Sequence, residues 1–189
     1  MNRNVKFIAA GIALLSALFF ISCSTQYAAY SKEIYTGKKL LEEKEYGKAK
    51  EYFTQASQDQ RDSASLALLG TAYYKTGDIA NAENAFREAE RIDKNGEYLL
   101  RILGYKSLVL LKQDKTEGFK ALREYAAYVK NLNIPFEMYD VDTMIAKNTA
   151  DFKVLDAKIE EQALWYENEI DMWNRGESNY FSEKYGRPM

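Results

Sequence analysis

Apolar residues along this chain follow two different patterns. Residues Phe7–Ile21 form one unbroken apolar run, whereas later stretches place apolar residues at steps of three and four among polar ones. Steps of three and four bring side chains onto one face of an α-helix. With only two prolines and abundant Ala, Leu, Glu and Lys, the chain is expected to be all-α.

The longest amphipathic pattern predicts a helix over residues 150–175. The positions of its apolar stripe are Phe152, Leu155, Ile159, Ala163, Tyr166, Ile170 and Trp173. Glu160, Glu161, Glu167 and Glu169 are assigned to the polar, solvated side of this helix. A shorter helix is expected over 136–147, with Pro135 near its first turn. The tail, 176–189, is expected to be irregular, although its aromatic residues could fold back on the body.

Two stretches align without a gap at an offset of 33 residues, TGKKLLEEKEYGKAKEYFTQA and LGTAYYKTGDIANAENAFREA. The residues that we expect to pack each pair of helices are Gly37, Ala49, Phe53 and Ala56 in the first stretch and Gly70, Tyr73, Ala82, Phe86 and Ala89 in the second. Small residues let the two helices approach, and the Phe ring is expected to fill the gap to the next pair. A pair of this kind cannot bury its apolar face alone and has to stack.

The second stretch resembles a complete tetratricopeptide repeat, with Leu69-Gly70, Tyr73, Gly77-Asp78 and the Ala82, Phe86, Ala89 spacing. The first stretch keeps most of these positions but has Lys44 where the family has a turn glycine. A third, degenerate unit begins at Leu103-Gly104, with a turn two residues longer. The resemblance implies a short right-handed α-solenoid of helix hairpins over 30–133. Helices over 134–175 would cap the array.

The amino terminus has the parts of an export signal over residues 1–22, with Arg3 and Lys6 before the apolar run. That run has 15 residues, fewer than the roughly 20 that cross a bilayer as a helix. Phe20-Ile21-Ser22-Cys23 resembles the lipobox of bacterial lipoproteins, in which the cysteine is acylated. The resemblance implies that Cys23 carries a lipid and that 23–29 is a short lipidated linker. An ordinary signal peptide or an uncleaved anchor remains the alternative.

Composition argues against catalysis. The chain has no histidine, which removes the most frequent general base and metal ligand, and its one cysteine cannot form an internal disulfide. We find neither a glycine-rich phosphate loop nor a metal-ligand spacing, so we expect no enzyme activity, no cofactor and no metal. A net charge of −2 gives no electrostatic footprint for nucleic acid.

In the tetratricopeptide family the first helices of successive repeats line a concave groove that binds a peptide or a helix. The resemblance therefore implies a partner-binding groove here, and we expect its anchors to be Lys38, Tyr74, Tyr98, Arg101 and Tyr105. Tyrosine and arginine suit this role because they offer contact area together with a polar tip. The alternative is that these tyrosines only fill the groove, with the last helix inserted into it.

The first functional hypothesis is a membrane-anchored interaction scaffold or assembly factor at the bacterial cell envelope, on the periplasmic face of the outer membrane. Its partners would be a protein or peptide of the envelope and, through the lipid on Cys23, the membrane. The second hypothesis is a ligand-binding accessory lipoprotein of a solute transporter. A large apolar pocket inside the array would favour the second, and a shallow open groove the first.

Overall fold

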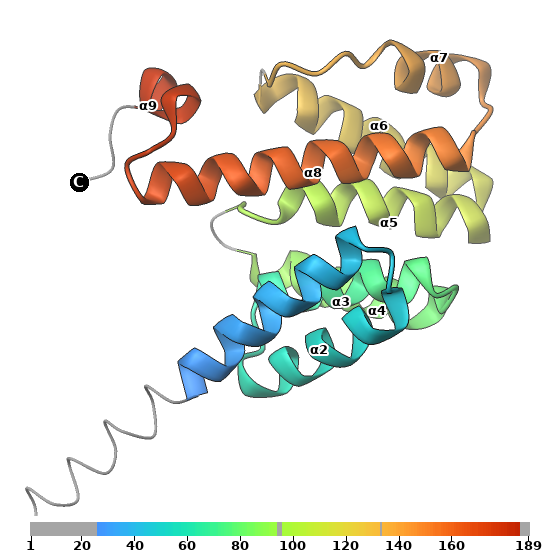
Figure 1. Ribbon diagram of the computed structural model, residues 1–189. Helices are drawn as coiled ribbons and strands as arrows, with labels where there is room; N and C mark the ends of the chain where they lie inside the picture. Colours follow the sequence, from blue (N-terminus) through green and yellow to red (C-terminus); the bar gives the residue numbers. More distant parts are fainter. Residues whose placement is uncertain (1–25, 94–95, 133, 186–189) are drawn as a thin grey trace, which may run out of the picture. The chain divides into compact units, whose positions relative to one another are not determined.

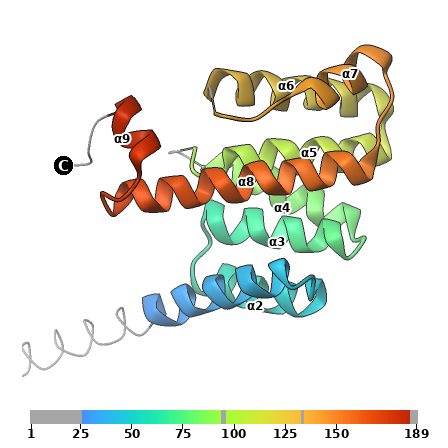
Figure 2. The same ribbon diagram turned by 45° about the horizontal axis from the view of Figure 1, so that its top comes forward.

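The structure is a computed structural model that describes residues 26–93, 96–132 and 134–185. All regular secondary structure in these ranges is helical, and successive helices pack in pairs as tetratricopeptide-like hairpins (Figures 1 and 2). The expected fold class is therefore confirmed. The chain divides into two compact units at Arg61/Asp62, and each unit is described separately.

The first unit contains a helix over residues 26–42 and α2 (Tyr46–Asp59). Gly37 lies directly under the Phe53 ring, where a β-carbon would overlap the ring. Lys44, in the turn, has φ 62°, a left-handed conformation that glycine adopts at lower cost. The helix already covers 26–29, so this part of the expected linker 23–29 is helical.

The second unit begins with the hairpin of α3 (Ser63–Lys75) and α4 (Ile79–Ile92). Asp62 and Asp78 cap the two helices, each accepting a hydrogen bond from a backbone N–H in the first turn. A β-carbon on Gly70 would lie 2.8 Å from Cε1 of Phe86. The sequence suggested that this Phe fills the gap between pairs. The structure shows that it also contacts the glycine of its own pair.

The next hairpin joins α5 (Leu99–Gln113) and α6 (Lys115–Leu132). The extra residues expected in its turn instead lengthen α5, because Asp114 alone separates the two helices. Gly118 makes the close approach possible: a β-carbon there would lie 2.5 Å from the backbone of Leu111. Gly104, expected to pack within the hairpin, faces Tyr125 of α6 and also Ile159, which belongs to a later helix.

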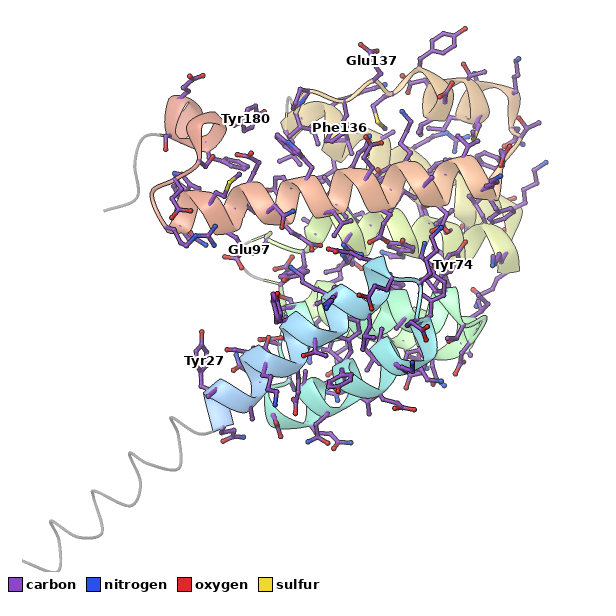
Figure 3. The ribbon with its side chains drawn as sticks, in the orientation of Figure 1. Tyr27, Tyr74, Glu97, Phe136, Glu137 and Tyr180 are labelled. Carbon is purple, nitrogen blue, oxygen red and sulfur yellow. The ribbon has the colours of Figure 1, made fainter. Side chains whose placement is uncertain are left out.

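Three further helices complete the second unit: α7 (Tyr139–Lys147), α8 (Phe152–Asn174) and α9 (Asn179–Tyr185). Of the tail predicted to be irregular (176–189), residues 179–185 are helical. Phe181 of α9 is buried, with its ring 5.8 Å from that of Tyr166 on α8. The contact of α9 with α8 supplies burial that a seven-residue helix cannot generate alone. Figure 3 shows Tyr180 on α9, and its ring lies 5.2 Å from that of Trp165 on α8.

The proposed signal peptide, 1–22, and the lipidation site Cys23 lie outside the described residues. Among the described residues no helix combines the length and apolarity needed to cross a bilayer.

Candidate binding groove

The inner helices of the second unit, α3 and α5, form the surface on which the groove was expected. α8 lies along α5 in both ribbon views and packs against it (Figures 1 and 2). Its apolar stripe faces inward, and Leu155, Ile159 and Ala163 are all fully buried. Within this unit, the last long helix therefore occupies the surface of α5 that the family resemblance assigns to a ligand.

Arg101 lies at the centre of this contact and is only 1 % exposed. Its Nε atom donates to Oε1 of Glu167 at 2.6 Å, and its Nη1 atom donates to Oε1 of Glu160 at 3.2 Å. Both carboxylates belong to α8. A buried guanidinium is tolerated only when its charge is paired and its donors are satisfied, and α8 supplies both requirements.

Two tyrosines of the expected groove lie beside Arg101. The Tyr105 hydroxyl donates to Oε2 of Glu160. The Tyr105 ring stacks on Phe86 at a centroid distance of 6.0 Å and meets the edge of Tyr74 at 5.4 Å. Both tyrosines are buried, Tyr105 at 0 % exposure and Tyr74 at 6 %. Their contact area is thus used inside the protein.

Two lysines, one on α3 and one on α5, lie near the other end of the contact with α8. Lys75, the last residue of α3, donates to Oδ1 of Asp156 at 2.7 Å and lies 4.0 Å from Glu160. The ammonium of Lys112, on α5, lies 4.5 Å from the centre of the Tyr74 ring, a cation–π contact. In this way α8 is joined to α3 as well as to α5.

The pKa shifts agree with an internally paired cluster. Burial lowers the pKa of the Arg101 guanidinium, but the Glu160 and Glu167 carboxylates raise it well above its usual value. Burial raises the pKa of Glu160, but Arg101, Tyr105 and Lys75 together lower it below the usual value. Burial and the Glu160 charge raise the pKa of Tyr105. Arg101 and Glu160 thus stabilise each other in their charged forms.

The five predicted anchors have different positions. Tyr74, Arg101 and Tyr105 come together, as the groove hypothesis required, but against α8. Tyr98 precedes α5 and is half-buried against the core. Lys38 is half-buried in the first unit. Partner binding by these residues stays a prediction. Partner binding by Tyr74, Arg101 and Tyr105 would require α8 to move, because these side chains are buried beneath it.

Sequence reasoning missed the acidic half of this cluster. Glu160 and Glu167 were assigned to a solvated face, yet their side chains are 20 % and 3 % exposed. Each follows an apolar stripe position by one residue, so the two carboxylates line the edge of the stripe. The spacing of Asp156, Glu160 and Glu167 (four and seven residues) was the available signal, because it repeats on one helix flank.

Another group of carboxylates lies around the turn that precedes α5. Burial, and then the charges of Asp93, Asp171 and Asp62, raise the pKa of Glu97. Burial also raises the pKa of Asp93, and hydrogen bonds from Ser63 and from the backbone of Gly96 and Tyr98 oppose this shift. In the described ranges no three acidic side chains are placed to hold a metal ion.

Comparison with known families agrees with the helix pairs. Residues 40–103 match the family model of the tetratricopeptide repeat. The matched segment is about a third of the chain and runs from the end of the first helix, through α2, α3 and α4, into α5. No match was found among curated proteins. This segment is thus a tetratricopeptide repeat region, a class of domain that is typically non-catalytic and binds proteins.

Proposed function

We propose that the protein is a membrane-anchored, non-catalytic scaffold that binds another protein at the bacterial cell envelope. The match of residues 40–103 to the tetratricopeptide repeat carries the proposal, because such repeats typically present a surface for a protein partner. The lipobox-like Phe20–Cys23 supports the anchor, and by resemblance to the lipoprotein sorting rule Ser24, rather than Asp, after the cysteine favours the outer membrane.

The buried groove restricts where a partner can bind. Arg101 and Tyr105 are fully covered, so a partner that meets the protein in this conformation contacts other surfaces. Tyr139 on α7 and Tyr52 on α2 are exposed, at 76 % and 39 %. Aromatic side chains at the surface are typical contributors to protein interfaces. The side chains between α3, α5 and α8 pack against one another in the core, which argues against a small molecule held inside the array.

Photocrosslinking in the native cell tests the scaffold. A photoreactive amino acid placed at Tyr139 or Tyr52 is expected to capture the same envelope protein reproducibly. The matched control is the same residue at Tyr105, which should capture no partner while α8 covers it. If neither exposed position captures a protein, the scaffold proposal fails at these surfaces. Capture from Tyr105 would instead show that α8 opens.

The lipid anchor is tested separately. Growth with labelled palmitate is expected to label the wild-type protein and to leave Cys23→Ala unlabelled, because the thiol is the proposed acyl acceptor. The variant should also move from the membrane fraction to the soluble fraction if the signal is still cleaved. Equal labelling of both proteins would remove the anchor from the proposal.

A further inference from the structure

The outward face of the first helix is rich in exposed tyrosine and lysine. Tyr27 and Tyr35 are 66 % and 73 % exposed, and Tyr27 points away from its helix in Figure 3. Lys32 and Lys39 are also exposed. Single exposed apolar residues are common at protein surfaces, but here two exposed tyrosines and two exposed lysines lie on one helix, with the Tyr27 ring 6.5 Å from that of buried Tyr30.

The spacing places most of these groups together. Lys32, Tyr35 and Lys39 follow one another at steps of three and four, so they share one side of the helix. Tyr27 and Lys38 are three helical turns apart on the neighbouring flank. We call these five residues the Tyr/Lys face.

The opposite side of the same helix packs against α2. Tyr30, Gly37 and Leu41 are buried there. Glu33 also points to that side: its Oε2 atom is buried, and burial and then the Asp59 carboxylate of α2 raise the pKa of Glu33. Since Glu33 is the sole acidic residue between 26 and 41, the Tyr/Lys face carries only positive charge along this length.

This chemistry fits the surface of an anionic bilayer. Tyrosine prefers the interface between water and lipid, where its ring is in an apolar layer and its hydroxyl remains hydrated. Lysines near a surface of anionic lipids are attracted to the phosphates, by about five-fold in partitioning per residue. Acidic residues return at Glu42 and Glu43, and Oε1 of Glu43 lies 3.8 Å from Nζ of Lys39 in an exposed ion pair, which is weak enough for a lipid phosphate to replace.

The position of the first helix along the chain also favours a bilayer as the surface that it contacts. The apolar run 7–21 ends five residues before the described helix begins, and Cys23 lies between them. A lipid on Cys23 would hold the amino-terminal end of the helix within about 10 Å of the membrane surface. The Tyr/Lys face is then the nearest exposed surface of the first unit along the chain.

We propose that the Tyr/Lys face of residues 26–39 lies on the bilayer, with Tyr27 and Tyr35 at the lipid interface and Lys32, Lys38 and Lys39 over anionic phosphates. This proposal rests on the lipid anchor at Cys23. The helix thereby sets the orientation of the first unit on the membrane.

Site-directed spin labelling of the full-length, acylated protein in vesicles tests this orientation. Acylation consumes the Cys23 thiol, so a nitroxide reacts only at an introduced cysteine. Tyr35→Cys is compared with Tyr52→Cys, an exposed tyrosine position on α2 of the same unit. When vesicles of phosphatidylethanolamine and phosphatidylglycerol are added, a water-soluble nickel complex is expected to lose more access to the label at 35 than to the label at 52. In phosphatidylcholine vesicles this difference should shrink.

Charge reversal provides the second arm. Lys32→Glu with Lys39→Glu should restore the access of the nickel complex to the label at 35. Lys115→Glu with Lys120→Glu changes the charge equally at exposed positions of α6 and should leave the label shielded.

Three results would overturn the proposal. Equal loss of access at 35 and 52 in protein that floats with the vesicles refutes the membrane face but leaves the anchor intact. Shielding at 35 in the Cys23→Ala variant, in buffer without vesicles, would assign the face to a protein contact. If the protein carries no palmitate and does not float with the vesicles, the anchor is refuted, and the membrane face is refuted with it.

Discussion

Replacing Glu167 with alanine is expected to lower the free energy of unfolding of the second unit by about 3–5 kcal/mol. The variant leaves the Arg101 guanidinium without its closest partner at a site that is 1 % exposed. Water cannot replace the carboxylate there without opening the α5–α8 contact. Both tryptophans of the chain, Trp165 and Trp173, are on α8, so denaturant unfolding followed by their fluorescence reports on this unit.

Two matched variants separate this effect from general damage. Arg101→Met with Glu167→Met removes both charges at similar volume and should recover at least about 2 kcal/mol relative to Glu167→Ala, because no buried charge remains unpaired at that contact. Lys130→Ala breaks the exposed Lys130–Asp142 pair and should cost less than about 1 kcal/mol. A loss below about 1 kcal/mol for Glu167→Ala would show that the cluster does not hold α8 in place.

The same cluster gives a pH dependence with a definite sign. The pKa of Glu160 lies below its ordinary value of 4.5, because its cationic and hydroxyl partners outweigh the effect of burial. A carboxyl with a lowered folded-state pKa stabilises the fold above its unfolded pKa, and this contribution is lost as the pH falls through the folded-state value. The stability difference between the wild type and Glu160→Gln should therefore shrink below about pH 4.5. The comparison is needed because the raised pKa of Glu97 acts in the opposite direction.

Phe86→Ala is expected to be the other large loss, about 3–5 kcal/mol in the second unit. The Phe86 ring is fully buried and fills the space over Gly70 of α3, and it also stacks on Tyr105 of α5. Its removal leaves a cavity between two consecutive hairpins. Tryptophan fluorescence during denaturant unfolding measures the loss, and Tyr52→Ala, at a partly exposed aromatic position, is the matched control.

A double-mutant cycle shows whether the ring and the glycine act as one unit. Gly70→Ala alone should cost about 1–3 kcal/mol, since the new methyl group would lie 2.8 Å from the ring. In the Phe86→Ala background the same change should become neutral or stabilising, because the obstacle is gone and alanine favours the helix. Gly47→Ala, where no atom lies within 4 Å, should not destabilise in either background. Purely additive losses would contradict the contact.

The hairpins could be predicted because their determinants are local. Gly70 and Phe86 lie on the two helices of one hairpin, and the repeat spacing identified both as packing residues. The spacing assigned Phe53 and Phe86 to the gap between pairs, and the structure added the contact of each ring with the glycine of its own pair. The third hairpin was recognised less well. Gly104 faces Ile159 of α8, and Gly118 allows α6 to pack closely against the backbone of Leu111 on α5. Neither contact follows from the repeat pattern.

The groove was predicted only in part. Family position brought Tyr74, Arg101 and Tyr105 together correctly, because those positions lie on the inner helices of every such repeat. Sequence reasoning left open whether the last helix enters the groove, and the cluster shows that it covers this part. The three acidic residues of the cluster, Asp156, Glu160 and Glu167, lie 55–81 residues along the chain from their partners. Periodicity within one helix cannot identify pairs at that separation.

The sequence by itself determined the helices, the two clear repeats and the small residues that let paired helices approach, since each depends on side chains within a few turns of one another. Only the tertiary structure decided that α8 covers the inner surface of α5 and that Arg101 is neutralised inside the protein. That choice depends on complementary charge and shape between distant segments, which only the folded chain brings into contact.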